Sequence, residues 1–221
     1  MEDYKKEFIK FLLNNNALRF GEFTLKSGRK SPYFINTGMF CDGKSVAKLC
    51  NFYAAHIVKV LGAEKVDVLF GPAYKGIPLC VATSISLATS FGINKPYAFD
   101  RKEAKGHGEC SNRKKMIVGH ELKNGEKVLI LDDVFTTGQT KIDTAELLKD
   151  IADVKFAGVL IAVDRMERGN DNENAIKEFE EQTGIRVYSI ISVKDIIYYL
   201  EKHKKTEEAE KIKKYLEKYG V

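Results

Sequence analysis

The sequence predicts an α/β fold, in which a parallel sheet is covered by helices on both faces. Short runs of branched apolar residues, the pattern of strands buried on both faces, recur along the chain. Longer segments with helical spacing of apolar residues separate these runs. Strands that alternate with helices in this way form crossover units and hence a parallel sheet. The run Lys127-Val-Leu-Ile-Leu131 is expected to be the central strand.

Composition indicates a globular protein of one domain. The 221 residues are 44% hydrophobic and 30% charged, which is enough to bury a substantial core. The net charge of +5 is mild and the acids are interspersed with the bases, so we expect no nucleic-acid partner. No apolar run is long enough to cross a bilayer, so we expect no membrane partner either. The four cysteines form no Cys-x-x-Cys pair, which favours reduced thiols in a cytoplasmic protein.

The first 40 residues are expected to form a segment of their own. Apolar residues at helical spacing, from Tyr4 to Leu12, predict a helix over residues 3–15. Alternating aromatic and polar positions on both sides of a Ser-Gly turn predict a hairpin over residues 18–37. A long amphipathic helix then begins near Asp42 and is expected to end at Gly62.

The core, residues 41–192, is expected to alternate strands and helices. After the first helix, the predicted order is strand 66–70, helix 77–91, strand 97–101, strand 127–131, helix 138–151, strand 158–163, helix 173–183 and strand 187–191. Two helices, 193–202 and 206–219, close the single domain of residues 1–221. The last helix is rich in Lys and Glu but keeps an apolar stripe, so we expect it to dock on the core.

The stretch after the central strand has the composition of a binding site. Asp132 and Asp133 follow the strand, and Thr136-Thr137-Gly138 leads into the next helix. Ligands of a parallel sheet bind at the carboxyl ends of its strands, and a helix N-terminus suits a phosphate. The carboxylates suit sugar hydroxyls or a hydrated metal. The alternative is an ordinary turn whose threonine caps the helix, but two buried vicinal carboxylates without partners would be costly.

This loop resembles the 5-phosphoribosyl-1-pyrophosphate (PRPP) loop of the type I phosphoribosyltransferases. It lacks the Gly-Lys-Ser/Thr of a Walker loop and the Gly-x-Gly-x-x-Gly of a dinucleotide site. Four further stretches resemble the orotate-specific members of that family. These are Phe23-Thr-Leu-Lys-Ser-Gly-Arg-Lys-Ser-Pro-Tyr-Phe34, Phe70-Gly-Pro-Ala-Tyr-Lys-Gly-Ile-Pro78, Asp100-Arg-Lys-Glu-Ala-Lys-Gly-His-Gly-Glu109 and Leu160-Ile-Ala-Val-Asp-Arg-Met-Glu-Arg-Gly169. All five occur in the family's order and span nearly the whole chain.

The resemblance implies a fold and a reaction. The fold is the type I phosphoribosyltransferase fold, a Rossmann-like parallel sheet flanked by helices, with a small hood from the N-terminal helix, the hairpin and the C-terminal part. The reaction transfers the phosphoribosyl group of PRPP to orotate, giving orotidine 5-monophosphate and pyrophosphate in pyrimidine biosynthesis. We expect Mg²⁺ to be held mainly by PRPP, with no metal site made by protein ligands, since this ion avoids all-protein cages. A homodimer is also implied.

Site residues follow from the same motifs. The implied catalytic residues are Lys105, Lys102, His107 and Asp133, with Lys102 reaching the partner subunit's site. The implied PRPP and pyrophosphate contacts are Lys26, Tyr74, Lys75, Arg101, Lys102, Lys105, His107, Asp132, Asp133, Val134, Phe135, Thr136, Thr137, Gly138, Gln139 and Thr140. The implied orotate contacts are Lys26, Phe34, Ile35, Thr136 and Arg165. Among these, Arg165 suits a carboxylate because its planar fork binds both oxygens.

Several alternatives remain open at this point. Phe34 could pack in the hydrophobic core instead of contacting the base. Ile35 stands where the family often has a second phenylalanine, so ring stacking at that position is not implied. Gln139 replaces the usual Thr or Ser, so Thr140 or a backbone N–H would cover the phosphate. Arg165 could instead pair with Asp164 or Glu167 at the surface, where such a pair is worth little.

Two loops also have non-functional interpretations. Residues 71–76 could need Gly and Pro for geometry alone. The basic segment 101–109, which the resemblance makes a catalytic lid, could be a solvated loop, and residues 110–115 are longer and more basic than the family's glycine-rich stretch. Two rival functions are a phosphoribosyltransferase for another base and a PRPP-binding regulator. The regulator would need a nucleic-acid module, and the sequence has no helix-turn-helix pattern.

Overall fold

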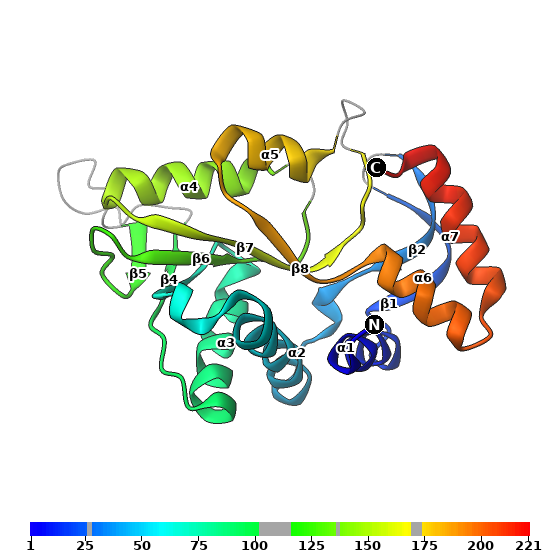
Figure 1. Cartoon of the computed structure of the whole chain (residues 1–221), viewed down its shortest axis with the longest axis horizontal. Helices are drawn as coiled ribbons and strands as arrows, with labels where there is room; N and C mark the ends of the chain where they lie inside the picture. The colour runs from blue at the N-terminus through cyan, green and yellow to red at the C-terminus, as the bar shows by residue number, and fades with distance from the viewer. Residues whose placement is uncertain (26–27, 102–115, 136–137, 169–173) are drawn as a thin grey trace.

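The structure, a computed structural model, describes residues 1–25, 28–101, 116–135, 138–168 and 174–221. Its centre is a six-stranded sheet in the order β5-β4-β3-β6-β7-β8 (Figure 1). The strands are β3 (Val68–Gly71), β4 (Tyr97–Asp100), β5 (Ile117–Gly119), β6 (Lys127–Leu131), β7 (Lys155–Asp164) and β8 (Val187–Ser192). Within these ranges, no helix is long and apolar enough to cross a membrane.

The predicted parallel sheet is confirmed for its five predicted strands, and the structure adds a sixth, antiparallel strand at one edge that the sequence analysis missed. Strands β4, β3, β6, β7 and β8 pair in parallel, whereas β5 pairs antiparallel to β4. β5 has three residues and ends at Gly119, whose φ of +99° bends the backbone out of the strand. A strand this short leaves no alternation of apolar and polar residues to recognise in a sequence.

Helices cover both faces of the sheet, as predicted. α2 (Gly43–His56) and α3 (Gly76–Phe91) lie on one face, and α4 (Gln139–Ile151) and α5 (Ala175–Thr183) lie on the other (Figure 1). Successive residues of β6 alternate between these layers. Leu129 belongs to the core under α2 and α3, and Ile130 belongs to the core under α4. Burial on both faces explains why this strand reads as a continuous apolar run.

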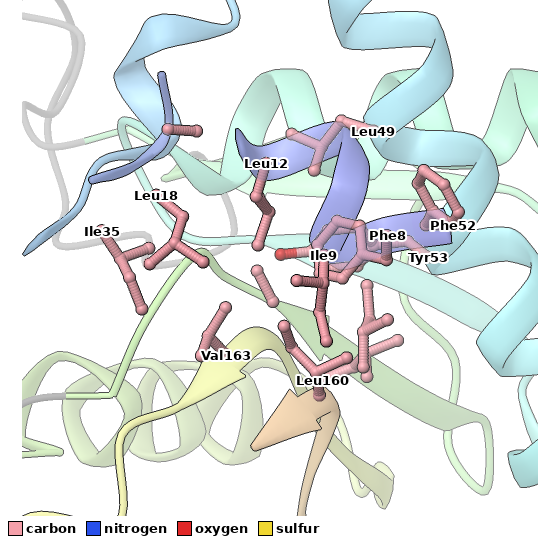
Figure 2. Close-up of a cluster of buried hydrophobic side chains, with 14 of the residues drawn as sticks. Phe8, Ile9, Leu12, Leu18, Ile35, Leu49, Phe52, Tyr53, Leu160 and Val163 are labelled. Atoms are coloured by element: carbon pink, nitrogen blue, oxygen red, sulfur yellow. The ribbon is translucent and has the colours of Figure 1, made fainter. Parts of the chain in front are cut away.

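The N-terminal segment forms the predicted helix and hairpin. α1 (Asp3–Asn14) buries Phe8, Ile9 and Leu12 in one cluster with Tyr53 of α2 and Leu160 of β7 (Figure 2). β1 (Leu18–Thr24) and β2 (Lys30–Ile35) pair antiparallel in a separate two-stranded sheet. The long predicted helix is α2, extended by a π-helical turn, Ile57–Leu61, and it ends at Gly62 with φ +84°.

The C-terminal helices complete the hood. α6 (Val193–Lys202) follows β8 through a capping box at Ser192, and α7 (Thr206–Tyr219) lies beside β2 (Figure 1). The rings of Tyr33 in β2 and Tyr215 in α7 meet edge to face, with centroids 6.1 Å apart. Ile212 is fully buried, which confirms that the Lys/Glu-rich last helix docks on the protein. Hairpin and C-terminal helix therefore meet at one end of the sheet, beyond β7.

Candidate functional site

Two loops meet where the strand order reverses. The chain runs outward from β3 to β4 on one side and from β6 to β7 on the other, while β3 and β6 are direct neighbours. In open α/β sheets, the crevice outside the carboxyl ends of such a pair is the usual ligand site. The loop after β3 holds residues 72–75, and the loop after β6 begins with Asp132 and Asp133. The sequence-predicted acidic pair therefore lies at this switch point.

Asp133 is the centre of contacts from three parts of the chain. Its Oδ2 accepts hydrogen bonds from Lys75 Nζ at 2.6 Å and from Thr37 Oγ1 at 2.8 Å. Its Oδ1 accepts from the Val134 backbone N–H at 2.9 Å. Burial acts to raise the pKa of Asp133, but these donors outweigh it and lower the pKa below its usual range. Thr37, which ends the hairpin segment, was missed because only the fold brings it here.

Asp132 has its own set of partners. Its carboxylate forms an ion pair with Lys141, and its Oδ1 accepts from the Asp133 N–H at 2.9 Å. Its backbone carbonyl accepts from the Tyr53 hydroxyl at 2.8 Å. Burial raises the pKa of Asp132, and Lys141 opposes that rise. Sequence reasoning missed Lys141, although it shares the helical face of Ala145 and Leu148, where a lysine signals a buried cation.

The turn into α4 depends on a glycine. Gly138 occupies the N-cap position with φ +78°, and a Cβ there would lie 2.9 Å from the Phe135 ring. A glycine, and not a threonine, therefore precedes the helix, and no side chain caps it among the described residues. Gln139 is exposed and donates to Asp143 Oδ1 at 2.7 Å. Thr140, the next residue, is also exposed. Gln139 and Thr140, two of the predicted phosphate contacts, therefore lie at the start of α4.

The predicted pyrophosphate loop, residues 72–75, is tied to both neighbouring strands. The Ala73 N–H donates to Asp100 Oδ1 of β4 at 2.6 Å, and Lys75 reaches Asp133. Gly76 packs so closely that a Cβ would lie 2.6 Å from the Pro72 ring. The loop therefore needs a glycine at this position for its geometry, whether or not it binds a ligand. Tyr74 is 70% exposed at the crevice, and Arg101 follows β4 half-buried.

Arg165 anchors a second cluster just past β7. Its Nε and Nη2 donate to Glu167 Oε1 at 3.0 and 2.6 Å, and its guanidinium lies 4.4 Å from the Tyr33 ring centroid. The Tyr33 hydroxyl donates to the same oxygen at 3.0 Å. Burial acts to lower the pKa of Arg165, but Tyr33 and Glu167 raise it above its usual value. The predicted pairing with Glu167 is present, but the two side chains are only 15% and 13% exposed, so it is not a surface pair.

The two clusters are joined through the backbone. The Ala162 N–H of β7 donates to the Asp133 carbonyl at 3.0 Å, and Val134 forms a bridge with Val163. Arg165 follows Val163 by two residues. The loop after β6 therefore runs beside the strand end that carries Arg165.

The two predicted base contacts in β2 point to opposite faces of the hairpin. Ile35 is buried in the main core, whereas the half-buried Phe34 stacks on Phe23 with ring centroids 5.5 Å apart. Their side chains cannot both flank one flat ring from the same face. The hairpin has two strands in the part of the chain described, so one edge of β2 carries backbone groups outside the ladder. That edge suits the polar rim of a planar ligand.

Several predicted residues lie outside the described residues. These are Lys26, Lys102, Lys105, His107, Thr136 and Thr137. The described part of the chain contains no group of three or more His, Cys, Asp or Glu side chains placed to hold a metal ion. It also contains three cysteines, Cys41, Cys50 and Cys80, all of them free.

Comparisons with known proteins agree with one another. The family model of the phosphoribosyl transferase domain matches residues 36–194. An orotate phosphoribosyltransferase of Vibrio cholerae is 47% identical over 223 residues, covering 100% of both chains. One of Clostridium acetobutylicum is 41% identical over 228 residues, also covering 100% of both. The crystal structure of orotate phosphoribosyltransferase from Francisella tularensis superposes with a TM-score of 0.85 at 41% identity, covering 97% of this chain and 100% of that one.

Proposed function

This chain belongs to the phosphoribosyltransferase family, among the orotate phosphoribosyltransferases, and we propose how its two clusters divide the reaction. The enzyme transfers the phosphoribosyl group of PRPP to orotate and releases pyrophosphate. The observation that carries the division is that the acidic pair and a helix start lie at the switch point, while the bridge from Val134 to Val163 brings the same loop beside the strand end that carries Arg165. A sugar phosphate and a carboxylated base need those two kinds of group side by side.

The acidic cluster is assigned to the donor. Asp132 and Asp133 would accept hydrogen bonds from the ribose hydroxyls, and Lys75 would leave Asp133 for the pyrophosphate. Residues 134–140 would cradle the 5-phosphate at the start of α4, where backbone N–H groups and the helix dipole favour an anion. The loop of Tyr74 and Lys75, with Arg101 beside it, would bind the pyrophosphate, and Lys26 would reach it from the hairpin.

The arginine cluster is assigned to orotate. Arg165 is held by Glu167 and Tyr33, so its orientation is fixed before the base arrives. Its charge would pair with the orotate carboxylate. The open edge of β2 at Phe34 and Ile35 would bond the polar rim of the ring through the backbone, which removes the conflict between the two side-chain directions. Lys26 and Thr136 would complete this side.

Catalysis would rest on charge and position, without a covalent nucleophile. The bond from C1 of ribose to pyrophosphate breaks, with its electrons leaving on pyrophosphate, and a bond to N1 of orotate forms. Positive charge on the ring would face Asp133, and negative charge on pyrophosphate would be neutralised by Lys105 and His107, which the resemblance assigns to a lid. Lys102 would come from the partner subunit of a homodimer. Closure of the lid would exclude the water that hydrolyses PRPP.

The residues present fit Mg²⁺ carried by PRPP. Asp132 and Asp133 offer the oxygen ligands that this ion prefers, yet each already has a lysine partner. PRPP would therefore supply most of the ligands of Mg²⁺, and Asp132 and Asp133 would be the protein groups that contact the ion. The ion would neutralise charge on the leaving pyrophosphate. We place the enzyme in the cytoplasm, where reduced cysteines and this biosynthetic role are expected.

The reaction can be followed by the loss of orotate absorbance after PRPP and Mg²⁺ are added. We expect loss that needs both PRPP and orotate, with stoichiometric pyrophosphate, and no consumption of uracil, which lacks the carboxylate. Pyrophosphate release with a purine base and none with orotate would overturn the assignment.

The shared site can be tested by mixing two inactive variants, Lys102→Ala and Asp133→Asn. Mixed dimers would contain one site with both native residues, so part of the activity should return. Heterodimers that form but stay inactive would remove the cross-subunit lysine.

A further inference from the structure

Lys141 is a buried cation that the donor site described above does not use. It lies in the first turn of α4 and is 5% exposed, although lysine is almost never buried without a partner. Its Nζ forms an ion pair with Asp132, donates to the Val134 carbonyl at 3.0 Å and lies 5.5 Å from the Phe135 ring centroid. All three partners belong to the loop that immediately precedes its own helix.

These contacts fold the loop around the ammonium group. Lys141 contacts three residues of one short stretch, Asp132, Val134 and Phe135. The Phe135 ring also packs edge to face against the Phe179 ring of α5, with centroids 5.4 Å apart. Gly138 closes the turn against the same ring. The lysine thus joins the end of β6 to the start of α4.

The two lysines of the acidic pair differ in a way that indicates different roles. The Lys75 side chain is 61% exposed, comes from another loop and meets Asp133. It can move to a ligand without leaving an empty space in the core. Lys141 is enclosed by its own loop, and removing its charge would leave Asp132 buried without a cation, which is costly.

We propose that Lys141 is a positioning residue for PRPP, which holds the Asp132 carboxylate charged and oriented and fixes the Val134 carbonyl, so that residues 132–135 keep the conformation seen here. This inference rests on the proposed donor role of the acidic pair. A carboxylate accepts a hydroxyl hydrogen bond roughly twice as strongly as a neutral acid does. Loss of the lysine should therefore weaken donor binding specifically.

The test compares Lys141→Met with Lys149→Met. Both remove one lysine charge from α4, but Lys149 is exposed and lies over Phe156, away from the loop. For Lys141→Met we expect KM for PRPP to rise about tenfold, with kcat changed less than about threefold and KM for orotate nearly unchanged. PRPP titrated into the enzyme without orotate should show the same loss of affinity. Lys149→Met should match the unaltered enzyme.

A second variant covers the case in which Lys141→Met does not fold. Asp132→Asn with Lys141→Met removes both charges, so it should have a higher Tm than Lys141→Met alone and should still bind PRPP about tenfold more weakly than the unaltered enzyme. Unchanged PRPP affinity in either folded variant would overturn the inference. So would an equal rise in KM for both substrates, which is the signature of a general structural role. Absence of orotate consumption by the unaltered enzyme would instead count against the proposed function.

Discussion

The two sides of the candidate site are built in opposite ways. On the acidic side, Asp132 and Asp133 come from one loop at the end of β6, and each is matched by a lysine. On the arginine side, Arg165 is matched by Glu167 and is held by Tyr33, which arrives from the hood 132 positions earlier in the sequence. The first side is a feature of the α/β core, and the second exists only where hood and core meet.

Under the proposed function, the acidic side binds the phosphoribosyl donor and the arginine side selects the base. The acidic side offers a sugar phosphate a helix start and carboxylates, a combination that any sheet of this kind can carry. The arginine side depends on the hairpin and on α7, whose Tyr215 backs Tyr33. Changes on the two sides should therefore affect different substrates, and the following predictions test that separation.

The largest effect is expected for Asp133→Asn. The substitution removes the negative charge that the proposed mechanism places against the ribose ring. It also breaks the pair with Lys75, whose side chain is 61% exposed, and weakens the bond from Thr37. We expect kcat/KM for PRPP to fall about 10³-fold, while orotate affinity in the absence of PRPP changes little. Steady-state kinetics and orotate titration measure the two quantities. Equal losses for both substrates would show that the two sides are not separate.

A smaller effect on the other substrate is expected for Arg165→Lys. Lysine keeps the charge but loses the planar fork that reaches Glu167 with two nitrogens. KM for orotate should rise about tenfold, with KM for PRPP unchanged. Arg186→Lys, at an exposed position near Tyr188, is the matched control. An Arg165→Lys enzyme with unaltered orotate kinetics would return Arg165 to a purely structural role.

The smallest effect on activity, but a clear one on stability, concerns the joint between hood and core. His56 of α2 is buried, its Nδ1 lies 3.2 Å from the Tyr4 hydroxyl of α1, and burial lowers its pKa to about 4. Between about pH 6.5 and pH 4, His56 is protonated in the unfolded chain but stays neutral in the folded protein. Stability is therefore fully present above about pH 6.5 and is lost as the pH falls toward 4.

From pH 7 to pH 5 this histidine should cost about 2 kcal/mol of the free energy of unfolding. Urea unfolding at both pH values measures it. His56→Gln should remove that part of the pH dependence, whereas His203→Gln, at an exposed position, should keep it. An identical pH dependence in the His56→Gln protein would contradict the buried neutral state.

The difference between the acidic side and the arginine side also explains which parts of the site the sequence could predict. The acidic pair and Gly138 lie within one stretch, and local chemistry alone indicated a phosphate and sugar site there. The helices and the five parallel strands also followed from local periodicity. Thr37 and Tyr53 were missed because only the fold brings them beside the acidic pair. Lys141 was missed although its place on the apolar face of its helix was a local signal of burial. The opposite directions of Phe34 and Ile35 in β2 also became clear only from the fold, and their role as orotate contacts stays a prediction.

A crystal structure with PRPP and orotate, or an unreactive analogue of either, tests the division of the site most directly. We predict ribose hydroxyls on Asp132 and Asp133, with Lys141 unmoved and Lys75 turned to the pyrophosphate, and the orotate carboxylate on Arg165. A donor bound elsewhere, with Lys75 still on Asp133 and Arg165 touching no ligand, would contradict the account.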